Sequence, residues 1–220
     1  MTTAPPATAL STLLPPTVHC TEAFGPPPHG ALLDAERRHI HGRSPRRQRQ
    51  FTAARTLARQ ALTELGHPPT PLLPGPGGAP DWPSGVAGSI THCTGYTACA
   101  ATRTTHLAGL GIDAEPAEPL PHGVLDLTAT ADERRHLTRL PCGQTPWDRL
   151  LFSAKEATYK ACYPLTRQWA GLATITVHLR PDHTFTACHP HHPTPHHGRW
   201  TATEGILITT LTIPRSATTG

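Results

Sequence analysis

The stretch TPWDRLLFSAKEATYKACYP, from Thr145 to Pro164, constrains the fold most, because it predicts one long amphipathic helix. Thr145 suits the N-cap, Pro146 falls in the first turn, where a proline loses no hydrogen bond, and Asp148 stands in the capping-box position. Pro164 is expected to end the helix. Apolar side chains recur at helical spacing and predict the face that packs on the core, namely Trp147, Leu150, Leu151, Ala154, Thr158, Ala161 and Cys162.

The other face of this helix carries Lys155, Glu156, Tyr159 and Lys160. Glu156 and Lys160 are four residues apart in the favourable order, and Lys155 and Tyr159 share the same spacing. On its own this pattern is typical of a solvated, salt-bridged surface.

A second stretch, Gly109 to Pro116, gives this face another interpretation. It reads GLGIDAEP and predicts a strand that ends in two carboxylates, Asp113 and Glu115. Alternate side chains of a strand lie on one face, so both carboxylates can converge on one cation. With Glu156 as a third ligand they would form an all-oxygen site of the kind that Mg²⁺ accepts.

A second long helix is predicted from Pro45 to Gly66, with Ser44 before it and prolines after it. Its other face is basic and carries Arg47, Arg55 and Arg59, with Arg46 and Arg49 nearby. A solvated basic face and a phosphate-binding face are equally consistent with this pattern.

The remaining elements predict an α+β fold in two halves, each with helices followed by an antiparallel sheet, that meet near residue 105. A short helix is expected at 31–42 and another at 131–140. Strands are expected around 17–24, 85–93, 96–101, 105–113, 173–179, 184–187, 199–203 and 206–213, with a turn at 102–104 and a hairpin at Glu204-Gly205.

Composition excludes several classes of protein. The net charge of +4 favours anionic ligands but is small for a duplex-DNA binder. The six cysteines include no CxxC pair, so neither a zinc ribbon nor a redox dithiol is indicated. No basic leader precedes an apolar segment, and no continuous apolar run approaches the roughly 18 residues of a membrane helix. We therefore expect a soluble cytoplasmic monomer that binds neither membrane nor nucleic acid.

The segment from His189 to His197 is rich in histidine and proline. It could bind transition metals, but its prolines prevent regular ligand spacing and favour a variable hairpin loop outside the functional site.

Three motifs, WPSGVAGSITHC, GIDAEP and FSAKEATYKA, resemble in this order the 4′-phosphopantetheinyl transferases of the larger, single-chain type that activates nonribosomal peptide and polyketide synthases. The match is nearest to actinobacterial members of the siderophore-synthesis class and covers about residues 46–199. The resemblance implies transfer of phosphopantetheine from coenzyme A to a serine of an apo acyl or peptidyl carrier protein, with release of adenosine 3′,5′-bisphosphate. It also implies two pseudo-symmetric lobes, residues 1–104 for nucleotide phosphates and residues 105–220 for metal and catalysis, with the active site between them.

The resemblance also assigns roles to residues. Asp113, Glu115 and Glu156 match the Mg²⁺ ligands, with Mn²⁺ as an alternative metal, and Lys155 and Lys160 match lysines that close over the phosphates. In this scheme Glu156 is the base, directly or through a metal-bound water, and Lys160 stabilises the leaving group.

His92 matches a residue that holds coenzyme A, and Arg47 and Arg55 match phosphate-binding residues. Many relatives also carry a basic residue shortly before the Trp-Pro pair, but Pro74 to Pro80 contains none, which leaves the anchoring to Arg46, Arg47, Arg55 and His92.

Two other functions share parts of this pattern. A Mg²⁺-dependent nuclease or phosphodiesterase also needs carboxylates and a lysine, but its usual ExK spacing differs from that of Glu156 and Lys160. A catalytically silent carrier-binding module is the non-enzyme alternative, and the presence of all three carboxylates and both lysines argues against it.

Overall fold

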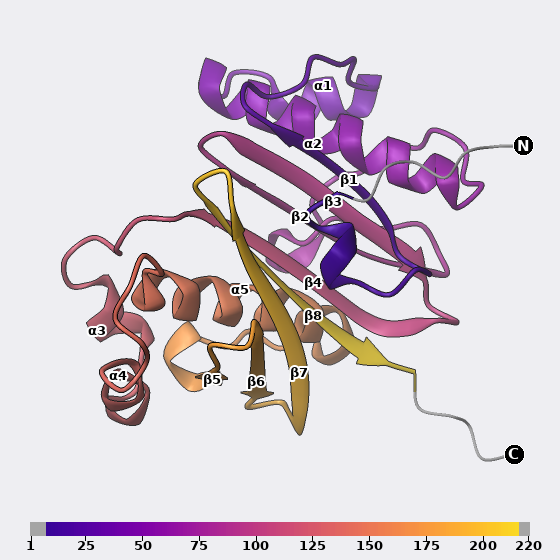
Figure 1. Ribbon diagram of the computed structural model, residues 1–220. Helices are drawn as coiled ribbons and strands as arrows, with labels where there is room; N and C mark the ends of the chain where they lie inside the picture. Colours follow the sequence, from indigo (N-terminus) through magenta and orange to yellow (C-terminus); the bar gives the residue numbers. More distant parts are fainter. Residues whose placement is uncertain (1–7, 216–220) are drawn as a thin grey trace, which may run out of the picture.

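The computed structural model describes residues 8–215 and confirms the α+β class. Within this range, helices pack on two antiparallel sheets, one of three strands and one of five (Figure 1). We call the three-stranded sheet with its helices the first lobe and the five-stranded sheet with its helices the second lobe.

The first lobe has the strand order β1-β3-β2. Its helix α2 begins as predicted, since the Ser44 side chain accepts a hydrogen bond from the Arg47 backbone N–H and a proline follows the cap. Ala58 and Ala61 of α2 are fully buried, so the helix lies close to the sheet. The elements are β1 (His19–Phe24), α1 (Asp34–Ile40), α2 (Pro45–Glu64), β2 (Val86–Cys93) and β3 (Tyr96–Arg103).

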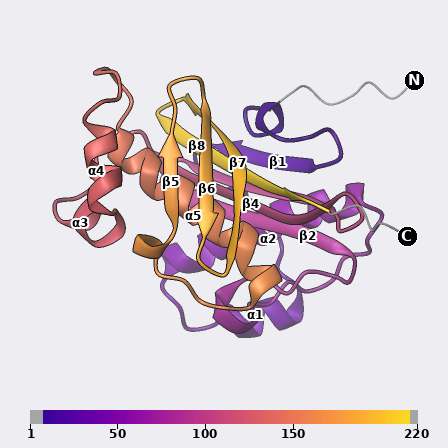
Figure 2. The same cartoon turned by 90° about the horizontal axis from the view of Figure 1, so that it is seen from below.

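The second lobe has the strand order β4-β8-β7-β6-β5, with α5 packed on β4 and β8. Figure 2 shows α3 and α4 at one outer end of this lobe. The predicted turn at Glu204-Gly205 joins β7 to β8, and both residues have the positive φ of a type I′ hairpin. The elements are β4 (Leu107–Pro116), α3 (Val124–Thr128), α4 (Ala131–Leu137), α5 (Trp147–Thr166), β5 (Thr176–Leu179), β6 (Thr184–His189), β7 (His192–Thr203) and β8 (Ile206–Pro214).

The two sheets meet where β2 lies beside β4. The Ile112 N–H donates to Ser89 Oγ at 3.0 Å, and the Ala114 N–H donates to Thr91 Oγ1 at 3.0 Å. Hydroxyl groups of β2 thus satisfy the free edge of β4, which holds the two lobes together at the position of Asp113.

Two glycines of β4 allow α5 to lie directly on this strand. A Cβ atom at Gly111 would fall 1.9 Å from the Ala157 carbonyl oxygen, and one at Gly109 would fall 2.5 Å from that of Ala161. No side chain fits between the two backbones, so the GLG sequence brings Asp113 of β4 next to the polar face of α5.

Both predicted ends of α5 were wrong. The N-cap is Pro146 rather than Thr145, and the carboxylate of Asp148 accepts hydrogen bonds from the backbone N–H groups of Leu120 and Arg149 instead of forming a capping box. Pro164 lies inside the last turn, because its missing N–H removes only one helical hydrogen bond this close to the end. The helix ends at Thr166, and the C-cap residue Arg167 has a φ of 53° and an N–H that donates to the Tyr163 carbonyl.

The segment 189–197 contains a hairpin, as predicted, but most of it is strand rather than loop. A turn at Pro190-His191 joins β6 to β7, and β7 already begins at His192. Pro193 and Pro195 are tolerated because this part of β7 pairs only with β6, next to a bulge; the pairing with β8 begins at Gly198. The turn expected at 102–104 also shifts, since β3 continues to Arg103, and the helix α3 was not predicted.

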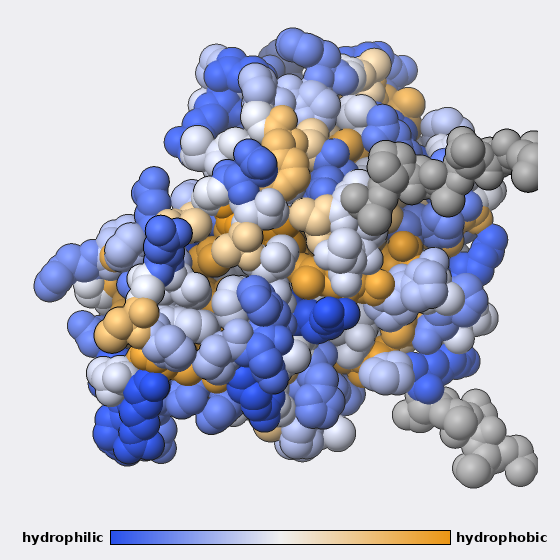
Figure 3. Space-filling model, in the orientation of Figure 1, coloured by the Kyte–Doolittle hydropathy of each residue, from blue (hydrophilic) through white to orange (hydrophobic). Residues whose placement is uncertain are grey.

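Hydrophilic residues cover most of the rim of the face shown in Figure 1, and hydrophobic residues are visible mainly in its centre (Figure 3). Among residues 8–215, no helix combines the length and the hydrophobicity that are needed to cross a membrane.

Candidate active site

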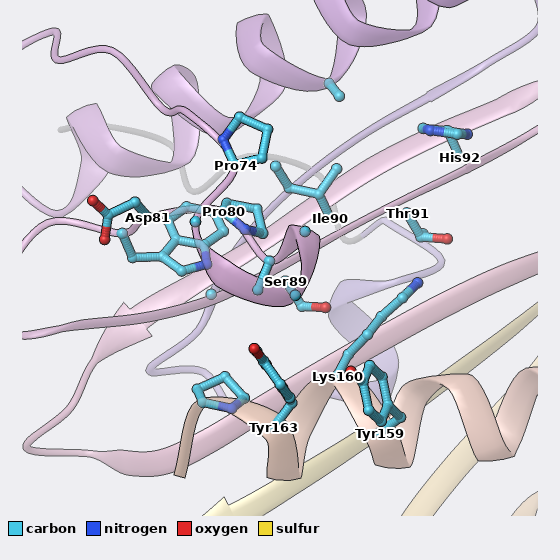
Figure 4. Close-up of a pocket in the computed structure, with 18 of the residues that line it drawn as sticks. Pro74, Pro80, Asp81, Ser89, Ile90, Thr91, His92, Tyr159, Lys160 and Tyr163 are labelled. Atoms are coloured by element: carbon cyan, nitrogen blue, oxygen red, sulfur yellow. The ribbon is translucent and has the colours of Figure 1, made fainter. Parts of the chain in front are cut away.

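A cavity of about 450 Å³ lies between the two lobes. Its first-lobe wall consists of the start of α2, the segment 74–82 and β2, and its second-lobe wall consists of Asp113 and the polar face of α5. Figure 4 shows Tyr159, Lys160 and Tyr163 projecting from α5 toward β2 and the segment that carries Pro74 and Pro80. The predicted site residues that line it are Arg47, Arg55, His92, Asp113, Glu156 and Lys160.

Asp113 is the best anchored of these residues. Its side chain is buried and accepts hydrogen bonds from Lys160 Nζ at 2.7 Å, Ser153 Oγ at 2.8 Å and Thr91 Oγ1 at 3.3 Å. Because the donors come from α5 and from β2, the carboxylate is held in place by both lobes.

Glu156 is partly buried and lines the same cavity. Burial raises its pKa, and the nearby charge of Asp113 raises it further. Two carboxylates that repel each other beside one cavity, with only oxygen donors, fit a hard divalent cation such as Mg²⁺. Asp113 and Glu156 could therefore hold such an ion.

Glu115 is not brought into the cavity lining. It forms an ion pair with Arg149, with 2.8 Å between Arg149 Nη1 and Glu115 Oε2. Burial and Asp113 raise the pKa of Glu115, and the hydrogen bond from Arg149 opposes this shift. Within residues 8–215, no three His, Cys, Asp or Glu side chains are arranged to hold a metal, so the structure does not assemble the predicted three-carboxylate set.

The two lysines of α5 lie in different environments. Lys160 is partly exposed at the cavity, where its Nζ also donates to the Ile112 carbonyl at 3.1 Å. Lys155 is fully buried behind the helix and donates to Glu133 Oε2 at 2.8 Å and to the carbonyls of Thr128 and Leu172. Lys155 does not reach the cavity. It lies five residues before Lys160 and therefore projects from another side of α5, toward α3 and α4.

The two arginines of α2 that line the cavity have different partners. Arg47 Nη1 lies 3.4 Å from His92 Nε2, and burial together with Arg47 lowers the pKa of His92, so its ring is neutral at pH 7. Arg55 is buried, and its Nε donates to the Leu72 carbonyl at 2.6 Å. Its Cζ lies over the Phe51 ring, 4.2 Å from the ring centre. Burial lowers the pKa of Arg55 to about 10, which keeps it charged at pH 7.

Arg46 does not line the cavity, although it lies in the same helical turn as Arg47. Arg59 is also absent from it, because its guanidinium pairs with the buried carboxylate of Glu36 at 2.7 Å.

Comparison with known proteins decides the family. The chain matches the family described as 4′-phosphopantetheinyl transferase N-terminal domain over residues 35–102 and the 4′-phosphopantetheinyl transferase superfamily over residues 109–211. It is 43% identical to the 4′-phosphopantetheinyl transferase Svp of Streptomyces mobaraensis, over 87% of this chain and 82% of that protein. The chain belongs to the 4′-phosphopantetheinyl transferases.

Two further relatives agree with this assignment. The chain is 40% identical to the 4′-phosphopantetheinyl transferase PptT of Mycobacterium tuberculosis, over 80% of each chain. It is 45% identical to the 4′-phosphopantetheinyl transferase Npt of Nocardia iowensis, over 74% of this chain and 72% of that protein. The protein is thus an enzyme, a transferase of the actinobacterial type, and the nuclease and the silent binding module are not favoured.

The three motifs of the transferase family contribute three neighbouring parts of the cavity, since they form β2, the end of β4 and α5. Sequence reasoning missed several other residues that line it. Tyr159 and Tyr163, with ring centres 5.4 Å apart, belong to the cavity wall and not to a solvated face. Their spacing of four residues was a visible signal for a shared helix face.

The segment 74–82 that lacks a basic residue lies against α5. Gly77 has a φ of +71°, and a Cβ atom there would fall 2.2 Å from Tyr163 Oη. Arg167, which follows α5, lines the same cavity as this segment. No local sequence signal indicated Arg167, because its position depends on the left-handed end of the helix.

Proposed function

We propose that this 4′-phosphopantetheinyl transferase moves the phosphopantetheine group of coenzyme A to a serine hydroxyl of an apo acyl or peptidyl carrier protein and releases adenosine 3′,5′-bisphosphate. The reaction would use Mg²⁺, with Mn²⁺ as an alternative. The observation that carries the proposal is that Asp113, Glu156 and Lys160 share one interlobe cavity with Arg47 and His92.

The second-lobe residues suit the chemical step. The serine oxygen forms a bond to the phosphorus of the pantetheine phosphate, the bond from this phosphorus to the oxygen of the adenosine 5′-phosphate breaks, and the serine loses its proton. A bound Mg²⁺ would neutralise charge on the pyrophosphate. Asp113 and Glu156 would hold that ion, and Lys160 would donate to the departing phosphate.

Glu156 is the group that would accept the serine proton, directly or through a water molecule. Burial and the charge of Asp113 raise its pKa above that of an exposed carboxylate, which makes Glu156 a stronger base.

The first-lobe residues suit recognition of the nucleotide. Arg47 and Arg55 carry positive charge at the cavity, and neither is paired with a carboxylate in residues 8–215. The phosphates of coenzyme A can bind such groups through charge-assisted hydrogen bonds. We propose that residues 1–104 bind the nucleotide phosphates, that residues 105–220 supply the metal site and the catalytic helix, and that Arg167 supplements Arg47 and His92 opposite the segment 74–82.

The acceptor would be a macromolecule rather than a second small substrate. The family acts on carrier proteins with coenzyme A. We propose that the interlobe cavity binds the nucleotide end of coenzyme A and that the pantetheine phosphate lies at its opening, where a carrier serine would reach it. We propose that the enzyme acts as a monomer in the cytoplasm.

Intact-mass measurement tests the proposal. The enzyme is incubated with coenzyme A and apo carrier proteins from fatty-acid, polyketide and peptide synthesis, with MgCl₂ or with EDTA. We expect a gain of one phosphopantetheine group, only with the metal, and its loss when the acceptor serine is replaced by alanine. Absence of transfer to every carrier would refute the proposed function.

A further inference from the structure

The two carboxylate oxygens of Asp113 have partners in different places. Oδ1 accepts hydrogen bonds from Lys160 Nζ at 2.7 Å and from Thr91 Oγ1 at 3.3 Å, and both of these residues line the cavity. Oδ2 accepts from Ser153 Oγ at 2.8 Å, and Ser153 is fully buried and does not line the cavity. One oxygen of Asp113 therefore faces the cavity, and the other faces the interior of the second lobe.

Ser153 is itself held by Thr209 of β8, the residue opposite Asp113 in the sheet. The two hydroxyl oxygens are 2.9 Å apart, and both residues are fully buried. Because a carboxylate oxygen only accepts, the single proton of the Ser153 hydroxyl goes to Asp113, and Thr209 is the donor to Ser153. Thr209 Oγ1 is also 3.1 Å from the Ser153 carbonyl, so its proton is shared between two oxygens of the same residue. Two buried hydroxyls thus form a chain that ends on Oδ2 of Asp113.

This chain leaves Asp113 with one oxygen for a ligand in the cavity. Oδ2 is bonded by a donor whose position the core fixes. Oδ1 differs, because its closest partner Lys160 is a flexible, partly exposed side chain that can turn to a phosphate. A carboxylate that binds a cation through both oxygens fits poorly into the octahedral geometry that Mg²⁺ demands, whereas Ca²⁺ has more numerous and more flexible oxygen ligands and accepts it.

We propose that Ser153, held by Thr209, is a positioning residue that keeps Oδ2 of Asp113 turned into the interior, so that Asp113 offers the divalent cation the single oxygen Oδ1. The site then favours Mg²⁺ and Mn²⁺ over Ca²⁺. This role rests on the proposed metal-dependent transfer, and it leaves Glu115 and Glu156 free to act on the same ion.

Binding of Mn²⁺ and Ca²⁺ tests this role without turnover. Free Mn²⁺ is measured by electron paramagnetic resonance while enzyme is added in the presence of coenzyme A and without a carrier protein. The affinity for Ca²⁺ is obtained from the displacement of bound Mn²⁺. Thermal unfolding identifies a temperature at which every variant is folded, and the titrations are done there.

The variants remove one hydroxyl at a time. Ser153→Ala removes the donor to Asp113, and Thr209→Val removes the second hydroxyl while keeping the shape of the side chain. Thr209→Ser keeps that hydroxyl. Thr158→Val is the matched control, because Thr158 is another fully buried hydroxyl residue of α5 but donates to the Ala154 carbonyl of its own helix.

We expect Ser153→Ala to weaken Mn²⁺ binding about 10- to 100-fold, the usual effect of losing a partner that orients a metal ligand. Binding of Ca²⁺ should stay within about threefold, because the freed Oδ2 can turn toward this larger ion. Thr209→Val should shift the preference in the same direction by a smaller factor. Thr209→Ser and Thr158→Val should leave both affinities unchanged.

The ratio of the two affinities separates positioning from support of the fold. A hydroxyl that only stabilises the core would lower the melting temperature without changing the preference between the ions. If Ser153→Ala weakens the binding of both ions by the same factor, or of neither, Ser153 does not position Asp113. If Thr209→Val behaves like Thr158→Val, Thr209 has no part in this role. Should Ser153→Ala fail to fold, the comparison of Thr209→Val with Thr209→Ser decides the same question.

The same titrations keep this role apart from the proposed function. If the unaltered enzyme binds Mn²⁺ and modifies a carrier but the ratio is unchanged in the variants, only the role of Ser153 and Thr209 is wrong. If the unaltered enzyme binds no Mn²⁺ with coenzyme A present, both proposals fail.

Discussion

The two 20-residue helices α2 and α5 form opposite walls of the cavity, but they present charge in different ways. Arg47 and Arg55 of α2 have a neutral histidine, a backbone carbonyl and an aromatic ring as partners, so this wall stays positively charged. Lys160 of α5 pairs with Asp113, and Glu156 and Arg167 add one charge of each sign, so the charge of that wall is nearly balanced. A positive wall suits binding of phosphates, and a wall of paired acids and a cation suits proton transfer and metal binding.

The largest effect should come from the α5 wall. Glu156→Gln keeps the size of the side chain but removes the proposed base and metal ligand, so kcat should fall by about 10²- to 10⁴-fold even at saturating coenzyme A. Glu64→Gln, an exposed acid of α2, is the matched control and should leave kcat unchanged. Steady-state kinetics with an apo carrier protein measure both. A rise in KM with kcat retained would show that Glu156 binds substrate only.

Substitution of the two lysines of α5 should have different effects, one on stability and the other on activity. Lys155→Met leaves the buried carboxylate of Glu133 without its cation and should reduce the free energy of unfolding by about 3–5 kcal/mol. Lys160→Met should lower activity and cost less stability than Lys155→Met, because Lys160 is partly exposed and Asp113 keeps the hydrogen bonds from Ser153 and Thr91. Urea unfolding and kinetics of both variants check this. Equal loss of stability would contradict a division of the helix into a structural and a catalytic face.

The α2 wall should affect binding rather than chemistry. Arg47→Ala removes a charged hydrogen bond, typically ~1.5–3 kcal/mol, and should raise KM for coenzyme A about 10- to 100-fold with kcat nearly retained. Arg46→Ala is the matched control, because Arg46 does not line the cavity. If Arg47 contacts the 3′-phosphate, the unaltered enzyme should have a higher KM for 3′-dephospho-coenzyme A than for coenzyme A. Arg47→Ala should have similar KM values for both. A loss mainly in kcat would remove the contrast between the walls.

Arg55→Ala is expected to raise KM as well, by the same 10- to 100-fold. Because Arg55 also holds the Leu72 carbonyl, this variant should in addition lower the melting temperature, which Arg47→Ala should not. Thermal unfolding beside the kinetics tests the difference. An unchanged melting temperature would mean that the contact with Leu72 adds nothing to stability.

The contact between α5 and β4 should tolerate no side chain. Gly111→Ala places a Cβ atom against the Ala157 carbonyl and should destabilise the protein by about 1–3 kcal/mol, while displacing Glu156 from Asp113. Gly143→Ala, at a glycine with open space, should stay within about 0.5 kcal/mol of the unaltered protein. Chemical denaturation compares the two. Equal stability of both variants would mean that α5 can shift without cost.

The smallest effect concerns the histidine hairpin, which belongs to neither wall. Since β6 and β7 pair through this segment, a deletion would disrupt the sheet, and substitution is the better test. Burial and neighbouring histidines lower the pKa of His189, so the unfolded state binds more protons and stability falls as the pH drops from about 6.5, the usual histidine value, toward the lowered pKa. His189→Leu should weaken this loss in melting experiments between pH 8 and 5 and leave turnover intact. A collapse of turnover at pH 8 with the fold preserved would link the hairpin to the active site.

Local sequence patterns predicted those parts of the molecule that depend on neighbouring residues. Hydrophobic periodicity located α2 and α5, the serine-proline pair located the start of α2, and the Glu204-Gly205 pair located a hairpin. The ends of α5 were missed because a proline near a helix end loses little, and the strand in the histidine segment was missed because only the pairing of β7 shows that its prolines lie at an edge.

The sequence by itself therefore determined the α+β class, the two long helices and the acidic and basic residues from which a site could be built. Only the tertiary structure decided which of them meet. Lys155 and Lys160, or Asp113 and Glu115, cannot be distinguished by spacing. Their partners Glu133 and Arg149 lie 22 and 34 residues away in the chain, and packing rather than local propensity brings these charges together.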